Sequence, residues 1–156
     1  MGSQPGQFHG PHGITSDSED NIWVADTFNN RVMKYSSRGE LLENWNDLSL
    51  NEPHGLAFET SGHLWITDKA NNRAIKINPE DKSLHFTVTN LNSPRDIALS
   101  RTYAYIADTD NHRIVRLNLA DDQMMTWGTY GDKDGQFNEP WSIAVDNTGD
   151  GDYTND

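Results

Sequence analysis

One ten-residue segment occurs three times in this chain. It reads DTFNNRVMKY, DKANNRAIKI and DTDNHRIVRL, starting at Asp26, Asp68 and Asp108. The spacing is therefore 42 residues and then 40 residues. A second marker, a proline that precedes a short apolar run, recurs with a similar spacing at Pro11, Pro53, Pro94 and Pro140. A period of about 40–45 residues is typical of solenoids and propellers, in which each repeat is one supersecondary unit.

Each repeat contains short apolar runs with the chemistry of strands. The run NIWVAD alternates in sidedness, and HLWITD and YAYIAD follow the same pattern. Such alternation, rich in β-branched and aromatic residues and bounded by Gly, Asn, Asp or Ser, predicts strands. In the first repeat the runs cover residues 13–15, 21–25, 31–35 and 41–45. Four strands per period predict an all-β fold made of four-stranded antiparallel β-propeller blades.

The repeats also divide the chain. We expect an N-terminal tail at 1–6, blades at 7–45, 46–89 and 90–127, and a partial fourth blade with an acidic tail at 128–156. The fourth repeat has the first strand, WSIAVD, and residues 153–156 stand at the place of a second strand. Because propellers typically close with about four to eight blades, the chain predicts an incomplete ring of about three and a half blades.

Two interpretations of the incomplete ring stay open. The chain is a segment of a longer propeller, or two copies form a homodimer that closes one ring. Unpaired strand edges tend to pair with other chains, and each interpretation provides a cover for them. Because the sequence stops within a blade, it favours the first interpretation, a segment of a longer propeller.

The composition limits the classes of partner. The chain of 156 residues has 12 basic and 24 acidic residues, a formal charge of -12. Such a charge repels nucleic-acid phosphates and anionic membrane surfaces. The chain has no cysteine, which excludes disulfides and thiolate metal sites. No signal peptide or transmembrane segment is visible, and the localisation stays unknown.

The repeated segment holds one motif, Asp-x-x-Asn-x-Arg. Its members are Asp26, Asn29, Arg31, Asp68, Asn71, Arg73, Asp108, Asn111 and Arg113. Asn tolerates left-handed backbone and therefore suits a tight link between two strands. Asp ends one strand and Arg starts the next, so the two can pair across the turn or with a neighbouring blade. A group repeated in every blade favours a structural role over a catalytic one.

The segments PHGITSDSEDNIWVADTFNNRVMKY and GDKDGQFNEPWSIAVD resemble the NHL repeat family. The pattern of that family is roughly P-x-G-I-A-V-D, then G-N-I-Y-V-A-D, then N-N-R-I. The resemblance covers residues 7–146 and implies a β-propeller, which in this family has about six blades. The chain departs from the pattern at Arg95–Asp96 and at Trp141–Ser142, where Gly is usual.

The residue after each repeat proline starts an innermost strand, which would line the central channel of a propeller. These residues are His12, His54, Arg95 and Trp141. Arg95 and Trp141 are our candidates for a ligand channel, since an aromatic ring there can stack on a sugar or a peptide side chain. His12 and His54 have two interpretations: they share a metal such as zinc, or they bond to neighbouring backbone.

The segments PHGI and PHGL also resemble those that hold an axial zinc in the lyase half of peptide-amidating enzymes, a six-bladed propeller. This resemblance implies His12 and His54 as metal ligands. It also implies Asp96, in PRDI, as a residue that helps to hold a structural calcium. Streptogramin-type lyases resemble the same architecture and use His. Separately, the stretch DNTGDG at 146–151 nearly matches a calcium-binding loop.

The sequence is compatible with three functions. The first, which we favour, is a binding scaffold for a protein, peptide or glycan. The second is a metal-dependent lyase of the peptidyl-amidoglycolate type with axial His ligands. The third is a purely structural segment. The sequence has no G-x-S-x-G, no phosphate-binding glycine loop and no H-E-x-x-H. A stoichiometric axial metal would separate the lyase from the scaffold.

Overall fold

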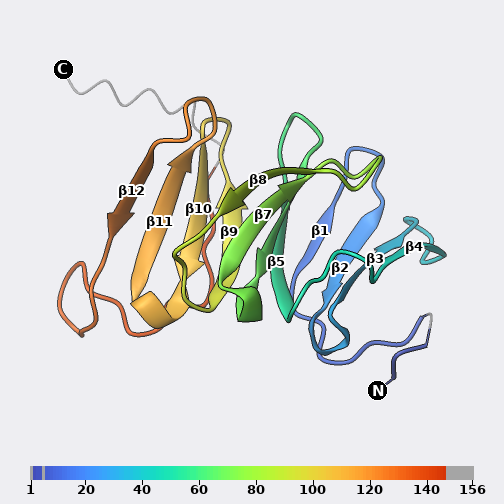
Figure 1. Ribbon diagram of the computed structural model, residues 1–156, viewed down its shortest axis with the longest axis horizontal. Coiled ribbons are helices and arrows are strands. Elements are labelled where there is room, and N and C mark those ends of the chain that lie inside the picture. The colour runs from blue at the N-terminus through green and yellow to red at the C-terminus, as the bar shows by residue number, and fades with distance from the viewer. Residues whose placement is uncertain (1, 5, 147–156) are drawn as a thin grey trace.

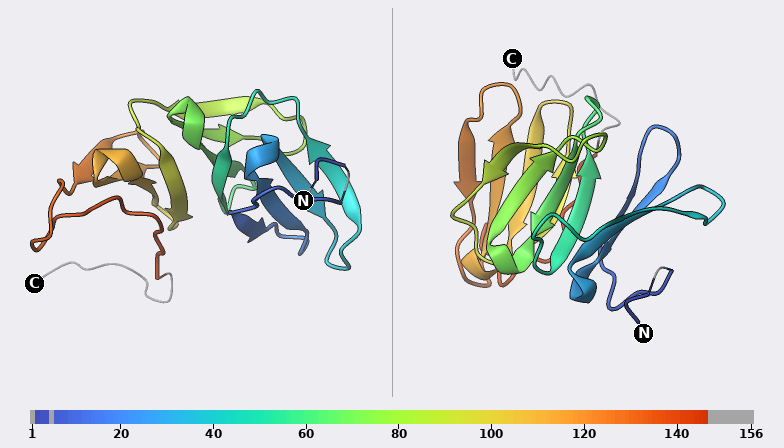
Figure 2. Two further views of the ribbon diagram at one scale, coloured as in Figure 1. Left: turned by 90° about the horizontal axis from the view of Figure 1, so that it is seen from below. Right: turned by 45° about the vertical axis from the view of Figure 1, so that its right-hand side comes forward.

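The computed structural model describes residues 2–4 and 6–146, and strands joined by short turns dominate it (Figure 1). Three four-stranded antiparallel sheets follow one another along the chain. In each sheet the strands lie in sequence order, so every sheet is a meander. The three sheets form an open arc, which Figure 2 shows from below. The predicted all-β fold of propeller blades in an incomplete ring is confirmed.

Each sheet is one blade, and its first strand lies on the inner side of the arc. Blade 1 holds β1 (Ile14–Ser16), β2 (Ile22–Asp26), β3 (Arg31–Tyr35) and β4 (Leu41–Trp45). Blade 2 holds β5 (Pro53–Phe58), β6 (Leu64–Asp68), β7 (Arg73–Ile77) and β8 (Leu84–Val88). Blade 3 holds β9 (Pro94–Leu99), β10 (Tyr103–Asp108), β11 (Arg113–Asn118) and β12 (Met124–Trp127). Among the described residues, no helix is long and apolar enough to cross a membrane.

A short 3-10 helix joins the second and third strands of every blade. The three are η1 (Thr27–Asn29), η2 (Lys69–Asn71) and η3 (Thr109–Asn111). The left-handed residue is the one that follows each helix, with φ of 54° at Asn30, 55° at Asn72 and 53° at His112. The motif Asn therefore precedes the left-handed position, whereas the sequence suggested left-handed backbone at this Asn itself, and its side-chain amide donates to the motif Asp.

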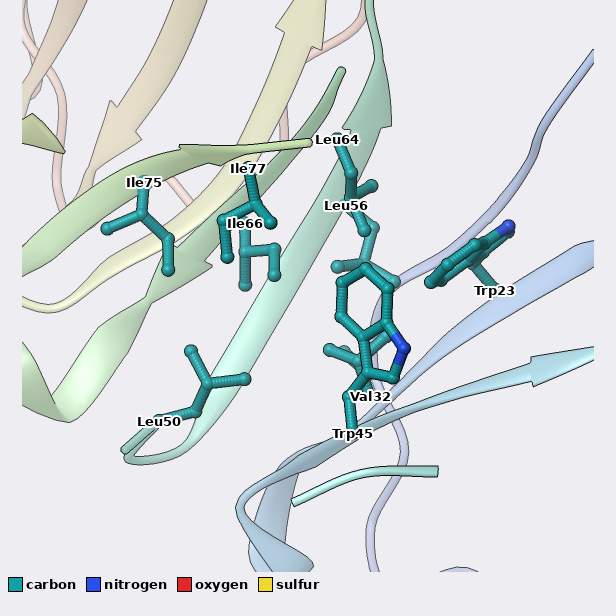
Figure 3. Packing of buried hydrophobic residues seen from close by; sticks show 10 residues of the cluster. Trp23, Val32, Trp45, Leu50, Leu56, Leu64, Ile66, Ile75 and Ile77 are labelled. Carbon is teal, nitrogen blue, oxygen red and sulfur yellow. The ribbon is translucent and has the colours of Figure 1, made fainter. Parts of the chain in front are cut away.

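The hydrophobic core lies between neighbouring blades. Blades 1 and 2 bury one cluster, part of which Figure 3 shows: Trp23, Ala25, Val32, Trp45, Leu50, Leu56, Leu64, Ile66, Ile75 and Ile77. In it the rings of Trp23 and Trp45 meet edge to face, with centroids 4.7 Å apart. A second cluster, which includes Trp65 and Ile106, joins blades 2 and 3 in the same way. Because each blade needs a neighbour to cover its apolar face, the packing repeats with the sequence.

The segment WSIAVD is not assigned as a strand. It nevertheless lies beside β9, because Ser142 Oγ and Ile143 N both donate hydrogen bonds to Asp96 Oδ2, at 2.6 and 3.0 Å. A strand is defined by the partner with which it shares a ladder. The expected partner at 153–156 lies outside the described residues.

Candidate functional site

The structure brings the four residues that follow the repeat prolines to the inner side of the arc. The imidazoles of His12 and His54 stack with ring centroids 4.2 Å apart and an interplanar angle of 25°. The guanidinium carbon of Arg95 lies 3.9 Å from the centroid of the Trp141 ring. The backbone carbonyl of Arg95 in turn accepts a hydrogen bond from His54, at 2.8 Å. These side chains therefore belong to one continuous surface.

Glycine allows the inner segments to approach this closely. A Cβ on Gly13 would lie 2.0 Å from the carbonyl oxygen of His54, and one on Gly55 would lie 2.8 Å from that of Arg95. Real Cβ atoms do not come so close to backbone, so the first two repeats require Gly at these positions. The repeat pattern PHG is therefore explained by the contact between adjacent inner segments.

In blade 3 Asp96 stands at the position of this glycine, and the Asp96 side chain makes hydrogen bonds instead. Oδ1 of Asp96 accepts a hydrogen bond from Ile97 N at 2.9 Å, and Oδ2 accepts the two from Ser142 and Ile143. The carboxylate thereby ties the fourth inner segment to blade 3. Asp96 and Ser142, the two residues that stand where Gly is usual, therefore contact each other.

Three threonines fix the inner segments to the preceding blade, and sequence reasoning missed them. Their hydroxyls donate to backbone carbonyls across the blade boundary: Thr27 to Pro53 at 2.7 Å, Thr67 to Arg95 at 3.0 Å and Thr109 to Pro140 at 2.8 Å. The available signal was the dipeptide Asp-Thr at the start of the first and third repeated segments. The contact to Pro140 shows that the fourth inner segment docks as the others do.

His54 is nine-tenths buried, at 9% exposure, whereas His12 is exposed. A carbonyl can only accept, so the bond to Arg95 places the hydrogen of the neutral imidazole on Nδ1 of His54. Its Nε2 then carries a lone pair, and within residues 2–4 and 6–146 this buried atom has no hydrogen-bond partner. Burial, assisted by the positive charges of His12, Arg95 and Lys69, lowers the pKa of His54 to about 4. His54 is therefore neutral at pH 7.

His12 makes a different contact. Its Nδ1 lies 3.1 Å from the hydroxyl of Thr27, which already donates to Pro53. The imidazole therefore donates to that hydroxyl through Nδ1. Nδ1 of His54 thus bonds to a backbone carbonyl, whereas Nδ1 of His12 bonds to a side-chain hydroxyl.

A shallow hollow of about 210 Å³ opens on this surface. It is lined by His12, Gly13, His54, Gly55, Asp96, Trp141 and Ser142. Trp141 is 54% exposed. In the described part of the chain, Nε of Arg95 is buried without a hydrogen-bond partner, and no carboxylate forms an ion pair with this side chain. The hollow therefore combines an exposed indole with the unpartnered Nε2 of His54, and the guanidinium of Arg95 lies beside it, against Trp141.

The Asp-x-x-Asn-x-Arg motif forms the same network in all three blades, away from the residues that line the hollow. Oδ2 of the Asp accepts from the Asn amide at 2.8, 2.8 and 2.9 Å and from Nε of the Arg at 2.7, 2.7 and 2.6 Å. Oδ1 accepts from the backbone N–H of His9, Asn51 and Asn92, at 2.7 Å in each case. Each Asp is fully buried. The network joins the turn, the third strand and the segment that enters the blade.

The candidate metal site at His12 and His54 has at most these two histidine ligands among the described residues. Within residues 2–4 and 6–146, no group of three or more His, Cys, Asp or Glu is placed to hold a metal ion. Arg95 and Trp141 are not ligands, and both oxygens of Asp96 already accept hydrogen bonds. A zinc site usually has four ligands, so others would have to join His12 and His54. Of the calcium-loop stretch DNTGDG, all but Asp146 lies outside the described residues.

Comparison with known proteins identifies the repeat. The model of the NHL repeat matches residues 8–35 and 50–73. Among curated proteins, NHL repeat-containing protein 2 of Bos taurus and that of Homo sapiens are each 29% identical over 83 residues, which is 46% of this chain. The match covers 11% of either relative, so the chain spans about a tenth of their length.

Several solved structures share the architecture. A chain of a nidogen/laminin complex superposes with a TM-score of 0.71 at 20% identity, over 91% of this chain and 54% of its own. A streptogramin B lyase gives 0.69 at 19% identity, over 86% and 45%. A catalytically inactive His-to-Ala variant of virginiamycin B lyase from Staphylococcus aureus with quinupristin gives 0.66 at 18% identity, over 80% and 43%. At these identities the likeness concerns the fold, which is that of β-propellers.

Proposed function

Because this chain carries NHL repeats at residues 8–35 and 50–73 and folds into the blades of an open β-propeller, we propose that it is a binding platform. Its ligand is a protein, a peptide or a glycan. The ligand occupies the hollow at the inner side of the arc, in contact with Arg95 and Trp141. NHL and related propellers commonly mediate binding, which supports this class of function.

One observation carries the proposal. Trp141 is 54% exposed and lines the hollow, and the guanidinium carbon of Arg95 lies over its ring, 3.9 Å from the centroid. Large exposed aromatic rings beside arginine are characteristic of binding surfaces, because they bury much apolar area and lose little conformational entropy on binding. Arg95 lies on β9, and the segment that holds Trp141 is tied to β9 by the hydrogen bonds of Ser142 and Ile143 to Asp96, which would hold the pair in place.

A screen of immobilised peptides and glycans tests the proposal, with Trp141→Ala as the variant. Tyr130→Ala is a matched control, since Tyr130 is also an exposed aromatic residue, at 67%, but lies outside the hollow. We expect Trp141→Ala to abolish the binding of any hit and Tyr130→Ala to preserve it. Equal retention by both variants, or no hit in either class, would contradict the proposal and favour a purely structural segment. A single-stranded RNA in the same screen should not bind, given the charge of -12.

A second candidate is the metal-dependent lyase. The buried Nε2 of His54 favours it, because the partner on Nδ1 is a backbone carbonyl, as is usual for a histidine that binds a metal. A bound zinc would polarise a substrate oxygen. The likeness to two lyases adds no more than a shared fold.

Zinc titration followed by calorimetry tests this alternative. If the candidate is right, the chain takes up zinc in a fixed stoichiometry, and the double variant His12→Ala/His54→Ala loses it. Uptake that the double variant retains would remove His12 and His54 from any metal site. The binding platform predicts ligand capture without added metal, so the two candidates are separable.

A further inference from the structure

Two groups at and beside the hollow have complementary hydrogen-bonding capacity: His54 lines the hollow, and Arg95 lies against Trp141, which also lines it. Nε2 of His54 is a buried acceptor, and Nε of Arg95 is a buried donor on a permanent cation, and neither has a hydrogen-bond partner within residues 2–4 and 6–146. Buried polar groups in native proteins nearly always find a partner. The two residues are also coupled, because the imidazole of His54 is fixed by the carbonyl of Arg95. A ligand that satisfies both groups at once would therefore suit the site.

The required ligand chemistry follows from the two groups. His54 is neutral, with its hydrogen on Nδ1, so the ligand must supply an N–H or O–H donor to Nε2. Arg95 offers the planar donor fork that matches an oxyanion, and its Nε has no hydrogen-bond partner among the described residues. The ligand thus carries a hydrogen-bond donor close to an anionic group.

We propose that the hollow binds a carboxylate flanked by a hydrogen-bond donor, as an acidic peptide segment presents it, with the carboxylate on Arg95 and the donor on Nε2 of His54. This inference rests on the proposed binding function and names its ligand class. The carboxylate comes from a C-terminus, where the last N–H is adjacent, or from an Asp or Glu side chain with its backbone N–H.

Asp96 distinguishes a carboxylate from a phosphate. Its carboxylate lines the same hollow, although both oxygens accept hydrogen bonds from the protein. One arginine and one aspartate leave the site without net charge, so a bound carboxylate leaves one negative charge, whereas a phosphate dianion leaves two and is repelled more strongly by Asp96. The acidity of the whole chain, at -12, adds to the cost of a dianion.

Four pools of degenerate hexapeptides test the ligand class by calorimetry. The first has a free C-terminus and no Asp or Glu, the second has an amidated C-terminus with one Asp or Glu, the third is amidated and neutral, and the fourth is amidated with one phosphoserine. We expect the first or second pool to bind roughly tenfold or more tightly than the third and fourth, as a charge-assisted pair implies. The better of the first two identifies the source of the carboxylate.

Arg95→Met should remove the preference for the carboxylate, while Arg38→Met, which removes an exposed cation on the β3–β4 turn, should leave it unchanged.

The imidazole ¹⁵N spectrum gives an independent readout that a purely structural role would not affect. Saturation with the binding pool should move the Nε2 resonance of His54 to its hydrogen-bonded position and leave that of Nδ1 in place. Thermal melting of Arg95→Met verifies that the variant is folded.

The results separate this inference from the proposed function. Binding that depends on Trp141 but is equal for acidic and neutral pools would overturn the carboxylate inference and leave the platform intact. An unmoved Nε2 resonance, or a preference that survives in Arg95→Met, would also overturn it. The absence of any hit dependent on Trp141, glycans included, would remove the proposed function itself.

Discussion

His54 carries two signals of a special environment, its burial and its unpartnered Nε2. The sequence singled out His12 and His54 as equivalent residues of two repeats. It could not show that one imidazole would be exposed and the other buried, because that difference depends on which blade lies next to each. His54 lies between blade 1 and blade 3, with His12 on one side and Arg95 on the other. His12 has one such neighbour among the described blades.

The lowered pKa of His54 predicts a pH dependence of stability. The folded-state pKa of about 4 lies below the ordinary value of 6.5, so between these pH values the unfolded chain binds the extra proton. Stability contributed by His54 is therefore constant above pH 6.5 and falls as the pH is lowered toward 4, by about 3 kcal/mol in total.

Urea unfolding of the wild type and of His54→Asn at several pH values measures this contribution. Asn can still donate to the carbonyl of Arg95 and does not titrate in this range. We expect the difference in unfolding free energy between the two proteins to change progressively between pH 6.5 and pH 4. Parallel pH profiles would show that His54 is protonated as easily in the folded state as in the unfolded state.

At the scale of the element, the inner segments are held by contacts that leave no space for a side chain at Gly13. We expect Gly13→Ala to destabilise the fold by about 1–3 kcal/mol, because its Cβ would lie 2.0 Å from the carbonyl oxygen of His54 and backbone must shift. Ser16→Ala, at the exposed end of β1, the strand that directly follows Gly13, should change the unfolding free energy by less than about 0.5 kcal/mol. Thermal or urea unfolding provides both values, and equal effects would show that the inner segments separate easily.

The turn network gives a second prediction at this scale. Asp68→Asn removes the charge that pairs with Nε of Arg73, and Asn cannot accept the three hydrogen bonds as a carboxylate does. We expect a loss of about 3 kcal/mol, the lower end for a broken buried pair, because the side chain of Arg73 is 29% exposed. Lys82→Met, which breaks the exposed pair with Asp47, should have little effect on urea unfolding. A small effect of Asp68→Asn would mean that the motif is retained for another reason.

The sequence predicted that the motif Asp and Arg pair across a turn or between blades, and the structure shows pairing across the turn within each blade. The 3-10 geometry of that turn was not predicted. Its signal is weak, since three residues without a helical period cannot be distinguished from any other short link. The threonine bonds between blades were missed for a related reason: a hydroxyl that bonds to a distant carbonyl leaves no local pattern.

At the scale of the whole molecule, blade 3 has an apolar face that no described blade covers. Tyr105 and Trp127 meet edge to face on it, with centroids 6.2 Å apart, at the places that Trp23 and Trp45 occupy in blade 1. Trp127 is 39% exposed there, whereas Trp45 is fully buried against blade 2. This face is therefore suited to another blade, from a longer propeller or from a second copy of the chain.

Light scattering of the purified chain tests whether a second copy of the chain covers the apolar face of blade 3. We expect a mass above the 17.6 kDa of one chain that rises with concentration, and we expect Trp127→Lys to lower it toward the monomer. A single species at twice the chain mass would favour the ring-closing homodimer. A folded monomer at high concentration would contradict association through this face and favour a segment whose neighbour is missing.

The sequence by itself determined the repeat, the four strands of each blade, the absence of disulfides and the equivalence of His12, His54, Arg95 and Trp141. These follow from local periodicity, because each repeat shows the same residue pattern. Only the tertiary structure decided which atoms of those residues stay unpartnered, how Asp96 replaces a glycine contact and where the hollow lies. Such properties arise between blades, where residues about 40 positions apart meet, and an interface of that kind depends on the shape of both sides at once.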